Sequence, residues 1–341
     1  MTDIALGWVG CGTHATQMLL PQLLRLPARV AALCDSDAAR LAATAARFNI
    51  PAAACFTDAR AMLAAGGFDA VGLAAGPAAH EALAIAALER GLPLFVEKPP
   101  APDLAGARRV AAAAARAQKP VVIGFMKRHA TANRIAGNLL AEAAFGPRAS
   151  VLGHYLTAPT YFSGNPDYTG FFLHHCVHAM DLAPWLAGSP VSRVRARSHE
   201  IAPGKLIIHA EFDFASGAIG TVAMGTLQSR GTPMEFWQVL GDHKRVEVRN
   251  VHEVRLYRHN PFKADDPAAT LRDGDDAMLW EPNHTAAADE DHKGYRALLA
   301  AFLAQVRGED VAAPDITDGV RAMAVLEAMM RSLASGAAEA L

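Results

Sequence analysis

The sequence predicts an α/β protein in which a doubly wound parallel sheet is followed by an α/β domain with a large, mostly antiparallel open sheet. Apolar runs typical of buried parallel strands alternate with helical patterns as far as about Met126. After Phe145-Gly146-Pro147, apolar and polar residues alternate along the strands, as they do in antiparallel sheets with one polar face. We therefore expect two domains, residues 1–128 and 129–341.

The composition argues against several classes of protein. The 341 residues are 52% hydrophobic and 19% charged, which favours a folded chain over a disordered one. A net charge of −2 without a basic stripe argues against a nucleic-acid partner. No apolar run reaches membrane-spanning length, and the N-terminus lacks the pattern of a secretory signal. We expect a cytoplasmic protein without a membrane partner.

The first predicted strand, Ile4 to Val9, ends in a glycine-rich turn. Gly10-x-Gly12-x-x-Ala15 follows it and opens a helical pattern that continues to about Leu26. This is the dinucleotide-binding fingerprint in its required context of strand, turn and helix. Gly10 permits the sharp turn, Gly12 lets a pyrophosphate approach the backbone, and Ala15 lets the helix pack closely. The N–H groups that begin the helix would then face the phosphates.

The second predicted strand ends at Asp35, about 20 residues beyond the fingerprint. An Asp at this point can accept hydrogen bonds from both ribose hydroxyls of the adenosine half. Asp35 and Asp37 would repel a 2′-phosphate. Arg40 could attract one, but an Arg at that distance is more often a solvated helix residue. The sequence therefore favours NAD over NADP.

The fifth predicted strand ends in a lysine. Its last two residues are Glu97 and Lys98, and Pro99-Pro100 prevents it from continuing. A Lys at a strand tip beside a cofactor can hydrogen-bond a substrate oxygen and stabilise charge on an alkoxide. Judged on these residues alone, the favoured interpretation is plainer: a surface Glu–Lys pair before a proline turn.

Three ionisable residues share one face of a predicted helix in the second domain. His174, His178 and Asp181 stand at positions i, i+4 and i+7. This arrangement suggests a general acid–base device, with a metal site or a structural histidine cluster as alternatives. Because no third ligand has a recognisable spacing, we predict no metal. The polar loop before the helix could line a sugar-binding cleft or be an ordinary loop; its candidates are Tyr161, Asn165 and Tyr168.

Together these stretches resemble the Gfo/Idh/MocA oxidoreductase family, which includes glucose–fructose oxidoreductase and inositol dehydrogenase. The resemblance covers nearly the whole chain. The residues that carry it are Gly10-x-Gly12-x-x-Ala15, Asp35, Gly76-Pro77-x-x-His80, Glu97-Lys98-Pro99, Gly124 to Arg128, His178-x-x-Asp181 and Phe302-x-x-x-x-Arg307-Gly308.

The resemblance implies a Rossmann domain followed by a domain for substrate binding and oligomerisation, whose sheet forms homodimers or homotetramers. It implies sugars, polyols or related hydroxy compounds as substrates. It also implies that Lys98 contacts the reacting oxygen, that His178 exchanges its proton, that Glu97 lies near the nicotinamide ribose, and that the Lys98–Pro99 bond is cis. Family dehydrogenases carry Asp four residues before the catalytic His. This chain has His174 there, and Asp181 could substitute.

These arguments give a full set of candidate residues. Cofactor contacts are expected from Gly10, Gly12, Thr13, His14, Asp35, Ser36, Gly76, Pro77, His80, Glu97 and Lys98. Substrate contacts are expected from Lys98, Tyr161, Asn165, Tyr168, His174 and His178, and catalytic roles from Lys98, His174, His178 and Asp181. The favoured function is an NAD(P)-dependent dehydrogenase or reductase acting on CH–OH groups of a sugar or cyclitol. The alternatives are an NAD-binding regulator without turnover and an NAD-dependent glycosidase.

Overall fold

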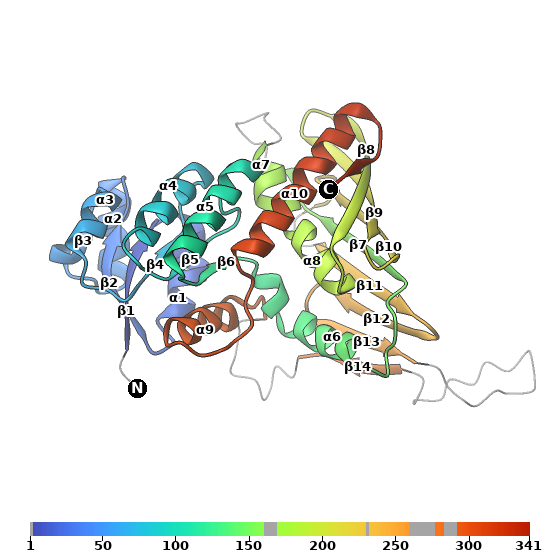
Figure 1. Ribbon diagram of the computed structural model, residues 1–341, viewed down its shortest axis with the longest axis horizontal. Coiled ribbons are helices and arrows are strands. Elements are labelled where there is room, and N and C mark those ends of the chain that lie inside the picture. The colour runs from blue at the N-terminus through green and yellow to red at the C-terminus, as the bar shows by residue number, and fades with distance from the viewer. Residues whose placement is uncertain (1–2, 160–168, 230–231, 259–276, 283–291) are drawn as a thin grey trace, which may run out of the picture. The chain divides into compact units, whose positions relative to one another are not determined.

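The structure is a computed structural model that divides into two compact units. The first comprises residues 1–129 and 294–324, and the second comprises 130–293 and 325–341. The first unit thus includes 294–324, a stretch that lies in the second domain of the sequence-based division. No helix among the described residues is long and apolar enough to cross a membrane. The described residues are 3–159, 169–229, 232–258, 277–282 and 292–341 (Figure 1).

The described part of the first unit contains a six-stranded parallel sheet in the order β3-β2-β1-β4-β5-β6. The predicted doubly wound parallel sheet is therefore confirmed. Its order reverses at β1, so the strands on either side of β1 leave a crevice at their carboxyl ends, where such sheets bind ligands. The strands are β1 (Ile4–Val9), β2 (Ala28–Cys34), β3 (Cys55–Phe56), β4 (Ala70–Leu73), β5 (Leu94–Val96) and β6 (Val121–Ile123).

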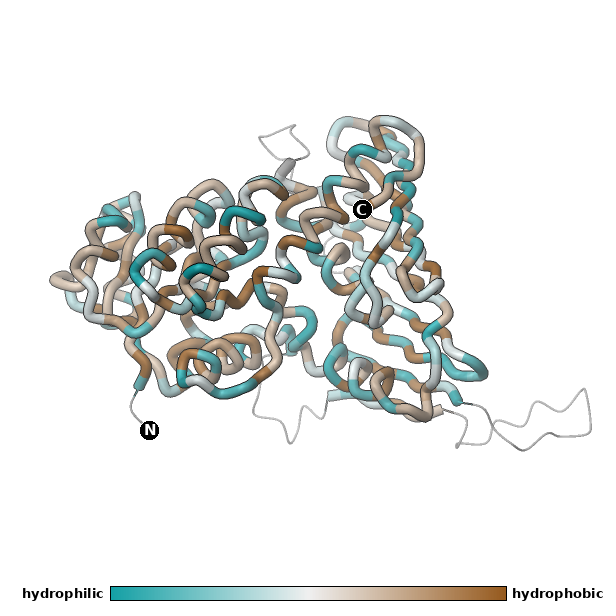
Figure 2. The backbone as a smooth tube through the Cα atoms, viewed as in Figure 1, coloured by the Kyte–Doolittle hydropathy of each residue, from teal (hydrophilic) through white to brown (hydrophobic). Residues whose placement is uncertain are grey.

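Helices cover both faces of this sheet (Figure 1). The first group packs into one core with β1 and consists of η1 (Ala15–Leu19), α1 (Leu20–Leu23), α2 (Ala38–Arg47) and α9 (Tyr295–Val306). The second group consists of α3 (Ala59–Ala65), α4 (Pro77–Leu88) and α5 (Leu104–Ala117). Polar residues recur among apolar ones along α5, as a helix with one solvated side requires (Figure 2). The unit also contains two short 3₁₀ segments, η2 (Ala52–Ala54) and η3 (Met126–His129), and the start of α10 (Ile316–Ser335).

Aspartate side chains begin three of these helices. Asp37 accepts from the backbone N–H groups of Ala39 and Arg40, and Asp58 and Asp103 cap α3 and α5 in the same way. Each cap satisfies a backbone donor that the helix itself leaves unpaired, which stabilises the start of a helix by about 1 kcal/mol. These helix starts therefore follow from single residues in the sequence.

The described part of the second unit contains a nine-stranded sheet in the order β14-β13-β12-β11-β7-β10-β9-β8-β15. Neighbouring described strands are antiparallel except β7 and β10, which confirms the predicted mostly antiparallel sheet. The strands are β7 (Ser150–Leu156), β8 (Val191–Ala202), β9 (Lys205–Phe214), β10 (Ile219–Gly225), β11 (Glu235–Gly241), β12 (Lys244–Arg249), β13 (Glu253–Tyr257), β14 (Ala277–Trp280) and β15 (Glu339–Ala340).

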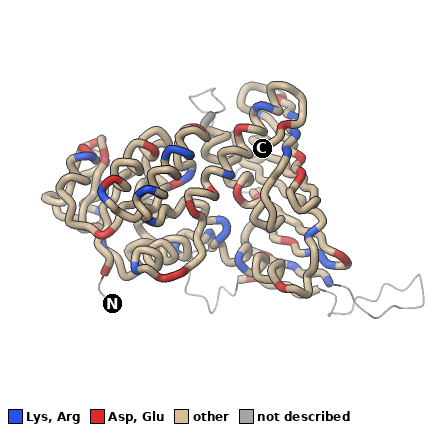
Figure 3. The backbone as a smooth tube through the Cα atoms, viewed as in Figure 1, with Lys and Arg blue, Asp and Glu red and all other residues tan. Residues whose placement is uncertain are grey.

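Helices pack against one face of this sheet. They are α6 (Thr131–Ala141), α7 (Thr169–Phe171), η5 (Phe172–Cys176), α8 (Val177–Ala187) and the end of α10 (Ile316–Ser335). On the covered face Gly153 leaves room for the ring of Trp237, because a Cβ at Gly153 would lie 2.5 Å from that ring. The other face carries pairs of opposite charge, such as Arg193 with Asp213, among the blue and red segments of these strands (Figure 3).

Candidate active site

The glycine turn after β1 has the geometry that its sequence predicts. Gly10 has φ = +104°, and a Cβ there would collide with the carbonyl of Ala74, so the position requires glycine. Gly12 differs, because no atom lies within 4 Å of the place its Cβ would occupy. This open space beside an exposed backbone is what a pyrophosphate needs. The turn therefore fits a dinucleotide.

The carboxylate of Asp35 is bound to the same turn. One oxygen, Oδ2, accepts from the N–H of Cys11 at 2.7 Å, and Oδ1 accepts from the N–H of Asp37 at 2.9 Å. Burial by itself would raise the pKa of Asp35, but these hydrogen bonds and the Arg40 guanidinium lower it below its ordinary value. The carboxylate is consequently ionised at neutral pH and held in one orientation.

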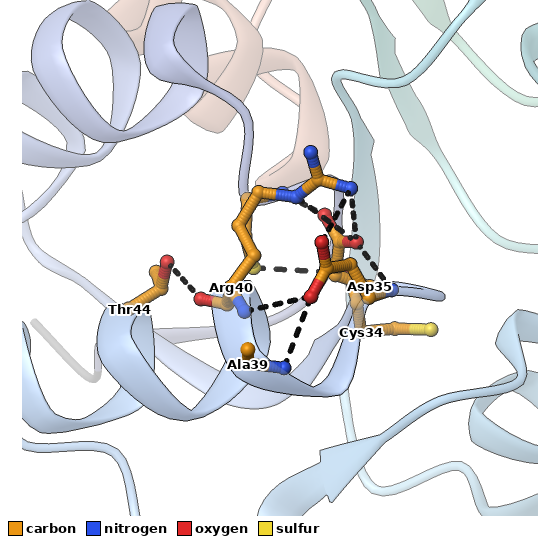
Figure 4. A network of polar contacts seen from close by, with 7 residues as sticks. Cys34, Asp35, Ala39, Arg40 and Thr44 are labelled. Atoms are coloured by element: carbon orange, nitrogen blue, oxygen red, sulfur yellow. Dashed lines mark hydrogen bonds and ion pairs between the residues drawn. The ribbon is translucent and has the colours of Figure 1, made fainter.

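Arg40 forms ion pairs in the structure, whereas the sequence favoured a solvated helix residue. Its Nη2 lies 3.1 Å from Asp35 Oδ1 and 3.7 Å from Asp37 Oδ2, while about half of the Arg40 side chain stays exposed. Figure 4 shows the guanidinium turned back over the Asp35 carboxylate. The acid at the end of β2 thus carries a permanent counter-charge.

Glu97, at the end of β5, is buried and only 6% exposed, so the plain surface-pair interpretation is wrong for this residue. Its Oε2 accepts from the N–H of Lys98 at 3.1 Å, and its Oε1 lies 3.4 Å from Nε2 of His14. Gly124 makes room for it, because a Cβ there would lie 2.7 Å from Oε1. Burial opposes ionisation, but His14, Lys98 and His80 lower the pKa of Glu97 below its ordinary value.

Lys98 follows Glu97, and its bond to Pro99 is cis, as expected. Burial lowers the pKa of the Lys98 ammonium, the negative charge of Glu97 opposes that shift, and Lys127 adds to it. A lysine in this state releases a proton more readily than one in water. The position is therefore suited to polar contact with a reacting oxygen.

His80 is held by backbone groups on both sides of its ring. Nε2 accepts from the N–H of Ala75 at 3.0 Å, and Nδ1 donates to the carbonyl of Pro99 at 2.8 Å. Burial lowers the pKa of His80, in agreement with this neutral tautomer. His80 therefore joins the turn that begins α4, at Gly76 and Pro77, to the turn after Lys98.

The remaining cofactor candidates lie at the exposed carboxyl edge of the same sheet. Thr13 and His14 are exposed beside the glycine turn, and Ser36 is exposed beside Asp35. The first unit thus gathers all the predicted cofactor residues along the ends of β1, β2, β4 and β5.

The helix of the second unit departs from its predicted geometry. Phe172–Cys176 is a π-helical segment between α7 and α8, so the chain takes more residues per turn than an α-helix. As a result the predicted common face is interrupted: His174 is exposed, whereas His178 and Asp181 are buried. His174 therefore differs from the other two residues in its exposure to solvent.

His175, which the sequence argument passed over, is buried in place of His174. Its ring stacks on Tyr155 with centroids 3.9 Å apart and planes 2° apart, and its Nε2 lies 3.0 Å from the Tyr155 carbonyl oxygen. The ring of His178 meets the same Tyr155 edge-on, at 6.2 Å. The alternation of β7 could have indicated Tyr155, but no sequence signal marks the π segment that selects His175.

The other predicted contacts divide between the units. Lys98 belongs to the first unit, and His178 and Asp181 belong to the second. Tyr161, Asn165 and Tyr168 lie outside the described residues. In the part of the chain that the structure describes, no group of three His, Cys, Asp or Glu side chains is arranged to hold a metal ion.

Comparison with known proteins shows which family the chain belongs to. The profile of an oxidoreductase family with an NAD-binding Rossmann fold (Gfo/Idh/MocA) matches residues 4–125, and the profile of the same family's C-terminal α/β domain matches 164–340. The chain belongs to this family. The predicted resemblance and the prediction of an oxidoreductase are both confirmed.

Individual Gfo/Idh/MocA relatives cover nearly the whole chain. An inositol 2-dehydrogenase of Leifsonia xyli is 30% identical over 318 residues, which are 90% of this chain and 86% of the relative. A dehydrogenase of Chromobacterium violaceum has a TM-score of 0.84 and 25% identity over 98% of this chain and 96% of its own. An Agrobacterium radiobacter oxidoreductase, solved with NAD+, L-tartaric acid and magnesium, has a TM-score of 0.83 and 20% identity, over 99% and 98% of the two chains.

Proposed function

We propose that this protein transfers hydride between a nicotinamide dinucleotide and a CH–OH group of a sugar, cyclitol or related hydroxy or keto compound. The observation that carries the proposal is the open space at Gly12 next to the buried Asp35 carboxylate. One provides room for a pyrophosphate and the other an acceptor for ribose hydroxyls. The Leifsonia relative's name, inositol 2-dehydrogenase, supports a cyclitol or sugar as the substrate class.

The chain's own residues then position the substrate and move its proton. When bound, the nicotinamide accepts or supplies the hydride. Lys98 hydrogen-bonds the reacting oxygen and stabilises its negative charge. His178 takes the hydroxyl proton during oxidation and returns it during reduction. Asp181, nearly one turn further along α8, stabilises the charged imidazole, the role that the family resemblance assigns to an Asp at the position of His174.

NAD is the proposed cofactor. The carboxylates of Asp35 and Asp37 would repel a 2′-phosphate, and an ionised Asp35 is suited to accept from a 2′-hydroxyl. Arg40 offsets part of this negative charge. The preference for NAD over NADP therefore depends on whether Arg40 keeps its ion pair with Asp35 when the dinucleotide binds.

A homodimer or homotetramer through the second sheet is the proposed assembly. The uncovered face of that sheet carries exposed apolar side chains on three neighbouring strands, Leu152, Ile219 and Leu240. Exposed apolar side chains gathered on one face are typical of protein–protein contacts. A molar mass measured in solution by light scattering tests it, with a monomer as the contrary result.

Titration of the protein with NADH and NADPH, followed by nicotinamide fluorescence, is the direct test of the function. A panel of polyols and aldoses is then added to the NAD-loaded protein. Tighter binding of NADH and growth of absorbance at 340 nm with one polyol are expected. Binding without any absorbance change would favour a regulator or an NAD-dependent glycosidase, and no binding of either nucleotide would overturn the proposal.

A further inference from the structure

His80 lies in the first turn of α4, and both nitrogens of its ring are bound to the backbone. The residue is only 1% exposed. Nε2 lies 3.0 Å from the amide nitrogen of Ala75, and Nδ1 lies 2.8 Å from the carbonyl oxygen of Pro99. Because an amide N–H only donates and a carbonyl only accepts, the ring is neutral and carries its proton on Nδ1. Both polar atoms of the side chain are therefore engaged within the protein.

The hydrogen bond to Ala75 holds a peptide that lies against the glycine turn. Ala75 stands between β4 and α4, and a Cβ on Gly10 would lie 3.2 Å from its amide nitrogen. The preceding N–H, that of Ala74, donates to the carbonyl of Val9 at the end of β1, at 2.8 Å. One side of the His80 ring is thereby fixed relative to the turn that would hold a pyrophosphate.

The hydrogen bond to Pro99 holds the segment that carries Lys98. Pro99 and Pro100 are both buried, and neither has an N–H that could anchor the backbone here. On the other side of Lys98, its own N–H donates to Oε2 of Glu97 at 3.1 Å. The backbone around Lys98 is therefore held before the residue by Glu97 and after it by His80.

The order of the sheet places this arrangement along a bound dinucleotide. Asp35, at the end of β2, lies on one side of β1 and marks the adenosine half. A dinucleotide that crosses the glycine turn reaches the other side of β1, where β4 and β5 end. Glu97 and Lys98, at the end of β5, would then lie at the nicotinamide half. His80 therefore connects the turn for the pyrophosphate to the lysine of the reaction.

We propose that His80 is a positioning residue, which fixes Lys98 relative to the glycine turn and makes no contact of its own with the dinucleotide. Its hydrogen bond to the Pro99 carbonyl determines where the Lys98 side chain meets the reacting oxygen. A displacement of about 1 Å in such a group can reduce the rate roughly 100-fold. This inference rests on the proposed function for the role of Lys98, and it replaces the cofactor contact that the sequence predicts for His80.

Two substitutions separate the two hydrogen bonds. In His80→Asn the amide nitrogen is attached to Cγ, as Nδ1 is, so it can donate to Pro99 while the bond to Ala75 is lost. In His80→Gln the amide stands at the distance of Nε2, so it can accept from Ala75 while Pro99 loses its donor. Each variant leaves one buried backbone group without its partner, and similar decreases in Tm are expected.

The deciding measurement is hydride transfer in a single turnover, with the polyol that the substrate panel identifies. His80→Gln should slow this step by roughly 10- to 100-fold and His80→Asn by less than about threefold. The Kd for NADH should stay within about threefold in both variants. His199→Gln, at an exposed position on β8, should leave both quantities unchanged. Equal slowing in the Asn and Gln variants would refute the role of the Pro99 bond. A loss of NADH affinity in His80→Gln that exceeds the loss of rate would indicate direct contact with the dinucleotide, and would also refute the proposal.

Amide hydrogen exchange tests the same bond without any turnover. A peptide spanning residues 94–104 should exchange faster in His80→Gln than in His80→Asn or the unmodified protein, because the segment around Lys98 loses its restraint only in the Gln variant. Unchanged exchange in His80→Gln would refute the role of His80 while leaving the cofactor assignment intact. Absence of NADH binding and of hydride transfer in the unmodified protein would instead refute the proposed function.

Discussion

Two buried carboxylates stand at the same edge of the first sheet, and they are compensated differently. Asp35 has two backbone N–H donors and the guanidinium of Arg40, which stays charged at all relevant pH values. Glu97 has one backbone donor and lies 3.4 Å from Nε2 of His14, and the Lys98 ammonium also lowers its pKa. The acid at the end of β2 is thus stabilised mainly by backbone N–H groups and a guanidinium, whereas the acid at the end of β5 is stabilised by an imidazole and an ammonium group.

The largest expected effect is the loss of turnover when Lys98 or His178 is replaced. Lys98→Met and His178→Gln should each reduce kcat on the true substrate by roughly 10²- to 10⁴-fold, because in the proposed mechanism each of these groups contacts the reacting oxygen or its proton. The Kd for NADH should stay within a few-fold in His178→Gln, because His178 is not among the expected cofactor contacts, whereas Lys98 is one of them. Stopped-flow kinetics and fluorescence titration measure both quantities, with His199→Gln as the control. Unchanged turnover in either variant would remove that residue from the mechanism.

The turn between the two acids offers a matched pair of glycine variants. Gly12→Ala should leave Tm of the nucleotide-free protein nearly unchanged, because its Cβ meets no atom, yet weaken NADH binding by roughly 10²-fold. Gly10→Ala should destabilise the fold by about 1–3 kcal/mol, since its φ is positive and its Cβ collides with Ala74. Calorimetric melting and NADH titration separate these outcomes. Equal losses of Tm in both would contradict the open space at Gly12.

Cofactor choice should respond to one acid and not to the other. Asp35→Asn should shift the ratio of NADPH to NADH affinity by roughly tenfold toward NADPH, because it removes the charge that repels a 2′-phosphate. Glu97→Gln should leave that ratio unchanged, since the two cofactors are identical at the nicotinamide. Competition titration with both nucleotides gives the ratio. A similar shift in both variants would mean that the two halves are not divided as the sheet order indicates.

The smallest effect concerns stability against pH. Both carboxyl groups have folded pKa values below their ordinary values of 3.8 and 4.5, so each adds stability above those values that is lost as pH falls through the folded pKa. Asp35→Asn and Glu97→Gln should each flatten the fall in Tm at acid pH. Melting curves at acid pH measure this effect, and an unchanged fall in Tm in either variant would contradict the contribution of that carboxylate.

The sequence was most informative where one residue type is physically required. The positive φ of Gly10, the space at Gly12 and the acid after β2 were each predictable because no other side chain meets the same demand. Both sheets followed from the change in hydrophobic periodicity. The assignment of roles to Lys98 and His178 stays a prediction.

The parts that escaped prediction depend on tertiary packing. An α-helical periodicity of 3.6 places His174 beside His178, but the π segment at Phe172–Cys176 changes that register, and nothing in the local composition signals it. The role of Arg40 was ambiguous in the sequence because its partner is Asp35, five residues earlier. The two side chains meet only because the chain turns between β2 and α2. The burial of Glu97 depends on Gly124, the residue that follows β6.

The return of α9 to the first unit has a consequence for how the protein is made. Leu298, Leu299 and Phe302 of this helix belong to the same core as β1 and α1, although the whole second sheet up to β14 precedes them in the chain. When residues 1–129 have left the ribosome, α9, which covers part of their core, has not yet been synthesised. The apolar surface that α9 covers therefore stays exposed until nearly the end of translation.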